Sequence, residues 1–332
     1  IQRLQSALDS ASFPVRPILQ SVIAKSYLNY LDYNQWRLRN RTAIDNPTGE
    51  GDIRTLTINQ LLEKAHELFT ASLQDNRLRQ AELSDFSAIL TEQKDSVALK
   101  LRPTLFDFLA HEALDFFTNE RSYLNQPANP FVIDDESYLG SAASFAKKSL
   151  TSKDTLSSKY QALLLFQELL AFHLEDEDPA ALVDADLKRL RFVHQNGKAI
   201  PNGDKWYLNA LERLKDRYSY HEVAGEVGWY EAQFYVERAR KYQPSPENIG
   251  KWDYQKAVEI LEKAIEQFPG SYGAKNARQL LAEIREKSIR FEMEKVELPG
   301  EEFLLSLEYR NLEKIWLRLA PVDQKLMEKI ER

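Results

Sequence analysis

The side chains best suited to catalysis or metal binding in this chain are its five histidines. These are His66, His111, His173, His194 and His221. A zinc site on a helix needs two histidines four residues apart, and no two of these histidines have that spacing. His111 lies inside a strongly helical segment, where a packed or surface histidine is the expected role. The spacing therefore predicts no metal site.

Sequence patterns for nucleophilic catalysis and phosphate binding are also missing. The chain contains no Gly-x-Ser-x-Gly elbow and no glycine-rich phosphate loop. It has no cysteine, which excludes a cysteine nucleophile, a thioester and a disulfide within it. The densest carboxylate run, residues 175–178, lacks the ligand ladder and the glycine of a calcium loop, and we interpret it as a solvated turn. We expect no enzymatic activity, no metal and no cofactor. An α-helical enzyme with an unrecognised site is a third hypothesis behind the two given below.

The charge balance bears on the partners of the chain. The net charge is −7 and the isoelectric point about 5.5, whereas nucleic-acid binding requires a basic surface. The one basic cluster, Arg37, Arg39 and Arg41 beside Trp36, is interpreted as a solvated helix end. No apolar run approaches the roughly 20 residues that a membrane span requires. We expect neither a nucleic-acid partner nor a transmembrane segment in this chain.

Most of the chain carries apolar residues at the three- and four-residue spacing of an amphipathic helix. Glycine, which is costly inside helices, is scarce at 11 of 332 residues. Short polar loops separate segments with helical spacing at 57–69, 103–118, 156–174, 179–196, 204–214, 219–234, 253–269 and 271–287. We predict a mainly α fold. An α-solenoid of antiparallel helix pairs would span residues 1–287, and a short antiparallel β tail would span 288–332.

Several predicted helices begin at a recognisable capping residue. Two capping boxes are predicted, Thr57 with Gln60 and Ser219 with Glu222. Three further helix starts are predicted from a proline or an aspartate, namely Pro103, Asp178 with Pro179, and Asp204.

One segment makes the repeat interpretation more specific. Residues 253–269 resemble the second helix of a tetratricopeptide repeat, with Tyr254, Ala257, Ala264 and Pro269 at the matching positions. The small alanines allow a partner helix to approach closely, and the proline ends the helix. The stretch that follows is expected to supply the first helix of the next unit.

Aromatic residues are concentrated between residues 229 and 254. Most of them are expected in the core, because aromatic side chains dominate core packing. Those that lie on a concave face would form hot spots for binding another protein. The candidate interaction surface consists of Trp229, Tyr230, Tyr235 and Trp252.

The pattern changes after Lys287. Apolar and charged residues alternate at 289–296, 303–309 and 315–319, which is typical of half-buried strands. Three strands are too few for an independent β-sandwich. We expect a small antiparallel element whose apolar side is covered by the last helices or by another copy of the chain.

Three stretches together resemble a known family. They are residues 102–117, residues 268–278, and the tail segments 298–301 and 308–319. In that order they are similar to the amino-terminal region of bacterial α2-macroglobulin-like proteins from Gram-negative cell envelopes, together with the start of the first macroglobulin domain. The resemblance covers most of the chain, and its tail segments are the most specific part.

The resemblance implies a large protein of the cell envelope, periplasmic or attached to the outer membrane, that traps or inhibits proteases. In that family a helical region precedes a series of macroglobulin domains, which are β-sandwiches. The trapping chemistry uses a Cys-Gly-Glu-Gln thioester and a bait segment. Neither is in this chain, so no catalytic residue carries over. The chain begins at Ile1 and shows no signal sequence, so we expect a processed chain or a part of a longer one.

Two main hypotheses for function follow. The first is a non-catalytic structural and protein-interaction module of an α2-macroglobulin-like, protease-inhibitor-type protein of the cell envelope. Its partners would be the rest of the same polypeptide and proteases or other envelope proteins. The alternative is a free-standing tetratricopeptide-like adaptor that binds peptides or partner subunits in a groove.

Overall fold

The computed structural model describes residues 1–38, 53–89, 96–119, 131–154, 156–244, 246, 248–293, 302 and 304–318. In this described part the chain is mainly helical, with packed adjacent helix pairs and a C-terminal two-stranded antiparallel sheet. The predicted fold class is therefore confirmed. Residues 298–301, 303 and 319, on which parts of the tail prediction rest, lie outside the described residues.

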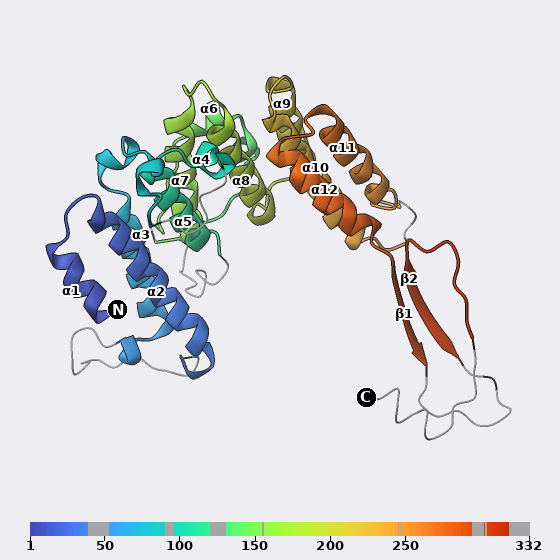
Figure 1. The fold of residues 1–332 in the computed structure, drawn as a ribbon, viewed down its shortest axis with the longest axis horizontal. Coiled ribbons are helices and arrows are strands. Elements are labelled where there is room, and N and C mark those ends of the chain that lie inside the picture. Colours follow the sequence, from blue (N-terminus) through green and yellow to red (C-terminus); the bar gives the residue numbers. More distant parts are fainter. Residues whose placement is uncertain are drawn as a thin grey trace.

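The helices follow one another along an elongated array (Figure 1). The first eight are α1 (Gln2–Ser10), α2 (Val15–Leu38), α3 (Ile58–Ser72), α4 (Ser96–Leu101), α5 (Leu105–Phe117), α6 (Ala142–Ala146), α7 (Ser158–His173) and α8 (Ala180–Asn196). The last four are α9 (Gly203–Arg217), α10 (Val223–Arg240), α11 (Asp253–Gln267) and α12 (Tyr272–Arg285). Short 3-10 helices lie at Ile53–Thr55, Asn76–Arg79, Leu83–Phe86 and Glu136–Leu139.

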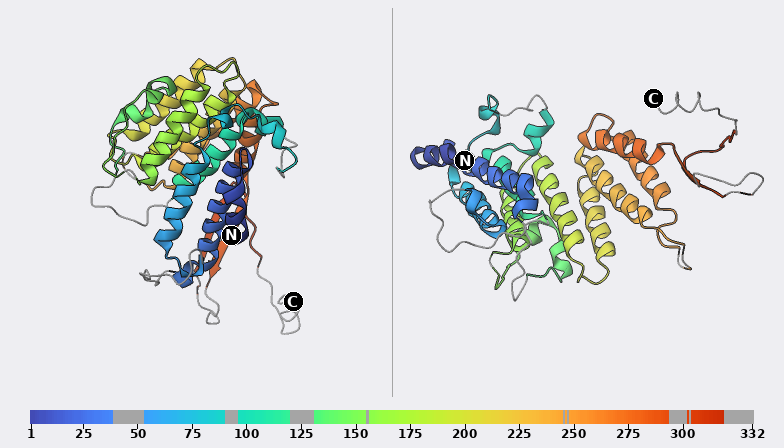
Figure 2. Two further views of the ribbon diagram at one scale, coloured as in Figure 1. Left: turned by 90° about the vertical axis from the view of Figure 1, so that its left-hand side faces the viewer. Right: turned by 90° about the horizontal axis from the view of Figure 1, so that it is seen from below.

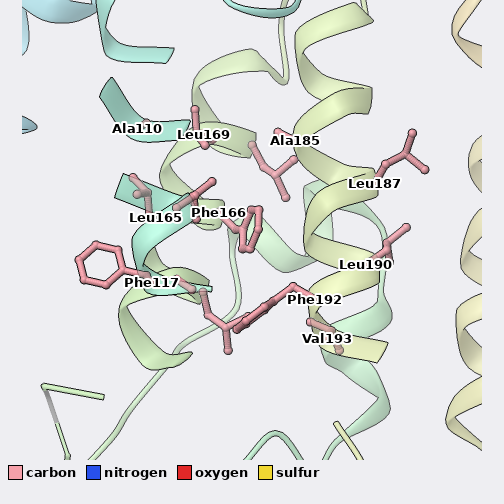
Figure 3. Close-up of a cluster of buried hydrophobic side chains, with 14 of the residues drawn as sticks. Ala110, Phe117, Leu165, Phe166, Leu169, Ala185, Leu187, Leu190, Phe192 and Val193 are labelled. Atoms are coloured by element: carbon pink, nitrogen blue, oxygen red, sulfur yellow. The ribbon is translucent and has the colours of Figure 1, made fainter. Parts of the chain in front are cut away.

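Neighbouring helices bury each other's apolar faces. Helix α2 packs on α3, α5 on α7, and α7 on α8, while α10 packs on both α11 and α12. Figure 3 shows the centre of the first half, where buried side chains of α5, α7 and α8 meet. There Phe166 and Phe192 lie with ring centroids 5.9 Å apart. Burying a side chain of this size contributes about 1.5–3 kcal/mol, so the three helices hold one another in place.

The helix starts confirm one predicted capping box and reveal another. Thr57 and Gln60 cap α3 reciprocally, as predicted. Helix α5 begins at Leu105, and Thr104 is its N-cap, so Pro103 precedes the helix. Its hydroxyl accepts from the backbone N–H of Asp107, and the Asp107 carboxylate accepts from the Thr104 N–H. The prediction that Pro103 lies in the first turn is therefore wrong.

The second predicted box, Ser219 with Glu222, is also wrong. Residues 219–221 still form the turn that leaves α9, with the His221 N–H donating to Tyr218 O at 2.9 Å. Helix α10 begins only at Val223, whose N–H donates to the His221 ring at 3.3 Å. The reason is that the exit turn of α9 uses the residues that a capping box would need.

The two aspartates predicted as caps have different outcomes. The Asp178 carboxylate accepts from the Ala180 N–H at 2.9 Å, so it serves the start of α8 from one residue further out than predicted. Asp204 lies inside the first turn of α9, and Asn202 precedes the helix with a φ of 55°. The prediction for Asp204 is wrong because the helix already begins at Gly203, and the Asp204 carboxylate contacts the His194 ring at 2.8 Å.

The region predicted as a tetratricopeptide-like unit forms two helices, α11 and α12, packed on α10. Ala257 and Ala264 are buried, as the pattern predicts. The closest approach is at Gly273 of α12, where an added Cβ would lie 2.2 Å from the Glu226 backbone nitrogen in α10. A glycine is therefore required at this crossing. The assignment to the tetratricopeptide class itself stays a prediction.

The tail forms a β-hairpin of β1 (Ser288–Met293) and β2 (Leu305–Arg310). The strands pair antiparallel, with Phe291 opposite Leu307. Residues 315–318, where a third strand was predicted, are not in a strand. Figures 1 and 2 show the hairpin extending away from the end of the helical array.

Candidate interaction surface

The four aromatic residues predicted as an interaction surface do not lie together on the outside. Tyr230 and Tyr235 are buried, with 7% and 3% of their surfaces exposed. Trp229 is half-buried and meets the Tyr230 ring edge-on at 5.1 Å. Trp252 is 68% exposed, with the Lys251 ammonium 5.2 Å from its ring centre. Because both tyrosines belong to the core of α10, only Trp252 is freely available to a partner.

A further apolar surface lies on one side of the hairpin. Directly opposite residues of antiparallel strands share a face, and here three such pairs are entirely apolar. We define the apolar face as Ile289, Phe291, Met293, Leu305, Leu307 and Tyr309. Phe291 is 64% and Tyr309 58% exposed. Side chains of this size are normally covered, so this face is a candidate for binding another apolar surface.

The other face of the hairpin is polar throughout. It carries Ser288, Arg290, Glu292, Ser306, Glu308 and Arg310. Arg290 and Glu292 form an exposed ion pair at 2.6 Å along the same strand. The hairpin thus has one dry side and one wet side, which is the pattern of a strand pair at the surface of a two-layer β structure.

The base of the hairpin is attached to the end of α12. The Arg310 guanidinium donates to the carbonyl oxygens of Glu283 and Glu286, both at 3.2 Å. The Asn311 amide donates to the carbonyl oxygens of Ile284 at 2.7 Å and Glu286 at 2.9 Å. The last carbonyls of a helix have no partners within it, and a cation there is favoured by the helix dipole. These bonds therefore fix the direction in which the hairpin leaves the array.

This attachment corrects the prediction for the tail. The last helices were expected to cover the apolar side, but α12 contacts the base of the hairpin and leaves the apolar face open. The physical reason is that the hairpin is bonded end-on, through backbone carbonyls of α12, and not across its face. Two strands alone are marginal in water, so a cover from another source stays a prediction.

A cluster of charged groups lies between α5, α8 and α10. The Asp184 carboxylate accepts from Arg102 at 2.7 Å and from Lys188 at 3.2 Å, and the His111 ring lies 3.8 Å away. Burial, with smaller contributions from Arg102 and Lys188, holds the pKa of His111 well below its usual value. Burial and the nearby Asp184 raise the pKa of Glu226 to about 8. These groups are perturbed mainly because the helices enclose them.

A second buried network joins α5 to α7. The His173 ring contacts the carboxylates of Asp107 at 2.7 Å and Asp176 at 2.6 Å. Burial lowers the pKa of His173, but the hydrogen bonds and charges of the two carboxylates outweigh it, so the pKa is raised. Asp107 also closes the capping box of α5. The histidine is therefore a structural link between two helices.

The largest fully buried side chain in the described part of the chain is Arg189 of α8, which has 0% exposure. It donates to the Asp186 carboxylate at 2.6 Å and to Gly140 O at 2.8 Å, and it also bonds Tyr138 O. This side chain ties the loop before α6 to α8.

In the first two networks, Asp184 and His173 bond charged groups from neighbouring elements, so these side chains link the helices. Within the described residues, no group of three or more histidine or acidic side chains is placed to hold a metal ion.

Sequence reasoning missed both the buried networks and the clamp at the base of the hairpin. The spacing of Asp184 and Lys188, four residues apart on one helix, is a signal that an ion pair can form. Nothing in that spacing shows that Arg102 joins them from another helix. Likewise, the local pattern indicates only that Arg310 and Asn311 lie at the end of a strand. Their bonds to the last carbonyls of α12 depend on where that helix ends.

No helix in the described part of the chain is long and apolar enough to cross a membrane. Comparison of the chain with family models, with curated proteins and with solved structures finds no match in any of the three.

Proposed function

We propose that this chain is a non-catalytic protein-interaction module, in which a helical array holds an apolar β-hairpin toward a partner. The observation that carries the proposal is the apolar face, with Phe291 64% exposed on a hairpin whose base is bonded to α12. A flexible tail would need no such attachment. Fixing the hairpin lowers the entropy that a partner must remove on binding.

The surface fits a partner with an apolar sheet face. A hairpin with one dry side and one wet side is complete only when a second apolar layer packs on it, about 10 Å away. The resemblance to α2-macroglobulin-like proteins supplies a specific proposal for that layer. It would be a macroglobulin-type β-sandwich of the same polypeptide, in a protease-inhibitor-type protein of the cell envelope.

Two structural details support this proposal because they fall in the stretches that carry the resemblance. Gly273, which permits the close crossing of α10 and α12, lies in the second stretch. Arg310 and Asn311, which clamp the hairpin to α12, lie in the third. The stretches thus contain the residues that fix where the hairpin is attached, which is the feature the proposed function depends on.

Hydrogen exchange followed by mass spectrometry tests the proposal. The hairpin amides of residues 288–293 and 305–310 would be compared in this chain alone and in the whole polypeptide that carries it. We expect fast exchange in the chain alone and strong protection in the whole protein, because a second layer covers the hairpin there. The amides of α7 serve as the internal control and should be protected in both. Equal, fast exchange of the hairpin in both samples would exclude a covering layer from the same polypeptide.

A further inference from the structure

We infer that the free edge of β1 pairs antiparallel with β1 of a second copy of this chain, about a two-fold axis at Phe291. The inference goes beyond the proposed function, because it concerns the edge of the hairpin and not its apolar face. Within the described residues, β1 pairs with β2 alone, so its other edge carries unpaired backbone groups. An exposed edge of this kind is a template for pairing with another strand.

The first argument is that β1 lacks three of the devices that prevent edge pairing. These are a proline, a bulge and an inward-pointing charge. The register of β1 with β2 runs through six consecutive residue pairs without a bulge. The strand Ser-Ile-Arg-Phe-Glu-Met contains no proline, and none of its three apolar-face residues is charged. The edge is therefore continuous enough to accept a partner strand.

The second argument is that the charges of β1 complement themselves. In an antiparallel pair centred on Phe291, Arg290 of one copy lies opposite Glu292 of the other, and the symmetry creates this contact twice. Both side chains are exposed, at 72% and 68%, so they are free to change partners. On the apolar face the two Phe291 rings would meet at the axis. Opposite charges and aromatic pairs directly across strands are stabilising.

The edge of β2 does not offer the same contact. Pairing about Tyr309 would place Glu308 opposite Arg310 of the second copy, but the Arg310 guanidinium is already held by Glu286 and by two carbonyls of α12. Pairing about Leu307 would place Glu308 opposite Ser306, without a charge pair. The charge pattern and the clamp together therefore favour β1 as the edge that meets the second copy.

Charge reversal tests both the contact and its register. Sedimentation velocity over a range of concentrations would measure the association constant of the wild-type chain, of Arg290→Glu, and of the double variant Arg290→Glu with Glu292→Arg. We expect a concentration-dependent dimer for the wild type and a loss of at least about tenfold for the single variant, because like charges then face each other twice. The double variant should recover the association. Lys263→Glu, the same charge change at an exposed position of α11, is the matched control and should associate like the wild type.

Cysteine substitution gives an independent test, since the chain has no cysteine of its own. Residues facing each other across antiparallel strands have Cα atoms about 4.5–5.5 Å apart, within the range for a disulfide. Phe291→Cys should form a covalent dimer under mild oxidation. Ile289→Cys and Met293→Cys should crosslink efficiently only when the two variants are mixed.

Three results would overturn the inference. They are a wild-type chain that stays monomeric at all concentrations, a double variant as weak as Arg290→Glu, and crosslinking that does not depend on position. None of them would affect the proposed function, because a covering layer on the apolar face does not need a second copy.

Discussion

The helical array and the hairpin differ in which side chains they bury and which they expose. Arg189 in α8 has 0% exposure, whereas Phe291 in β1 has 64%. The array places a charged group in its core and satisfies it with Asp186 and two backbone carbonyls. The hairpin presents six apolar side chains on one open side. The buried charge of Arg189 is paired and joins two parts of the fold, whereas the apolar face of the hairpin is left exposed in the described part of the chain.

The contrast also bears on how the perturbed titratable groups are interpreted. Strongly shifted pKa values often mark active sites, but ion-pair networks inside a fold shift them as well. Here the shifts arise where α5, α8 and α10 enclose Arg102, Asp184 and Glu226. The hairpin differs in that large apolar side chains such as Phe291 stay exposed in the described part of the chain, and the proposed function places the partner contact there.

Of the substitutions that test this contrast between array and hairpin, one at Arg189 should have the largest effect on stability. We expect Arg189→Met to lower the free energy of unfolding by roughly 3–5 kcal/mol, because Asp186 is left charged and unpaired in the core. Urea unfolding followed by circular dichroism measures this. Replacing both residues, with Asp186→Leu added to Arg189→Met, should recover part of the loss because no charge is then buried. The control is Arg290→Ala in the exposed hairpin pair, which should change the stability by less than about 0.5 kcal/mol.

Glu226 gives a prediction of the opposite sign. Its pKa is raised to about 8 from an ordinary 4.5, so the folded state binds a proton that the unfolded state releases. A group of this kind stabilises fully below pH 4.5, and its contribution is lost as the pH rises to about 8. We therefore expect Glu226→Gln to stabilise the chain by about 1–3 kcal/mol at pH 8 and by little at pH 5.

Urea unfolding of both chains at several pH values measures this difference. A gain that is the same at pH 5 and pH 8 would show that the carboxyl is not held neutral by its surroundings.

A smaller effect is expected at two helix starts: that of α5, where the capping box of Thr104 and Asp107 was not predicted, and that of α10, where the predicted box of Ser219 and Glu222 is absent. Thr104→Ala should cost about 1 kcal/mol, because it removes the acceptor for the Asp107 N–H at the start of α5. Ser219→Ala should be nearly neutral, since Ser219 lies in the exit turn of α9 and its side chain caps no helix. Thermal unfolding of both variants measures the contrast. Equal losses would mean that the start of α10 is different in solution.

The elements that local spacing determines could be predicted, and those that depend on distant partners could not. The helical segments at 156–174 and 253–269 were predicted within a few residues because a three- and four-residue apolar pattern is a property of the segment itself. The hairpin pairing follows from alternation in the same way. The box of Ser219 and Glu222 failed because the preceding helix ends later than the local pattern shows. The prediction that Tyr230 lies on an interaction surface was wrong. Helix α10 is buried on most sides, so most of its aromatic residues belong to the core.

The smallest effect on stability, and the sharpest test of the comparison, is expected at Phe291. In a dilute solution of this chain, Phe291→Ser should change the free energy of unfolding by less than about 0.5 kcal/mol. The reason is that the exposed ring of Phe291 makes few contacts within the chain. Phe166→Ser, at 1% exposure in α7, is the buried counterpart and should cost more than about 3 kcal/mol. Fluorescence of a dye that binds apolar surfaces should fall for Phe291→Ser. If Phe291→Ser instead destabilised the monomer by 2 kcal/mol or more, a cover for the ring would already exist within this chain. The hairpin would then belong to the fold like the helices, and the proposed interaction surface would be lost.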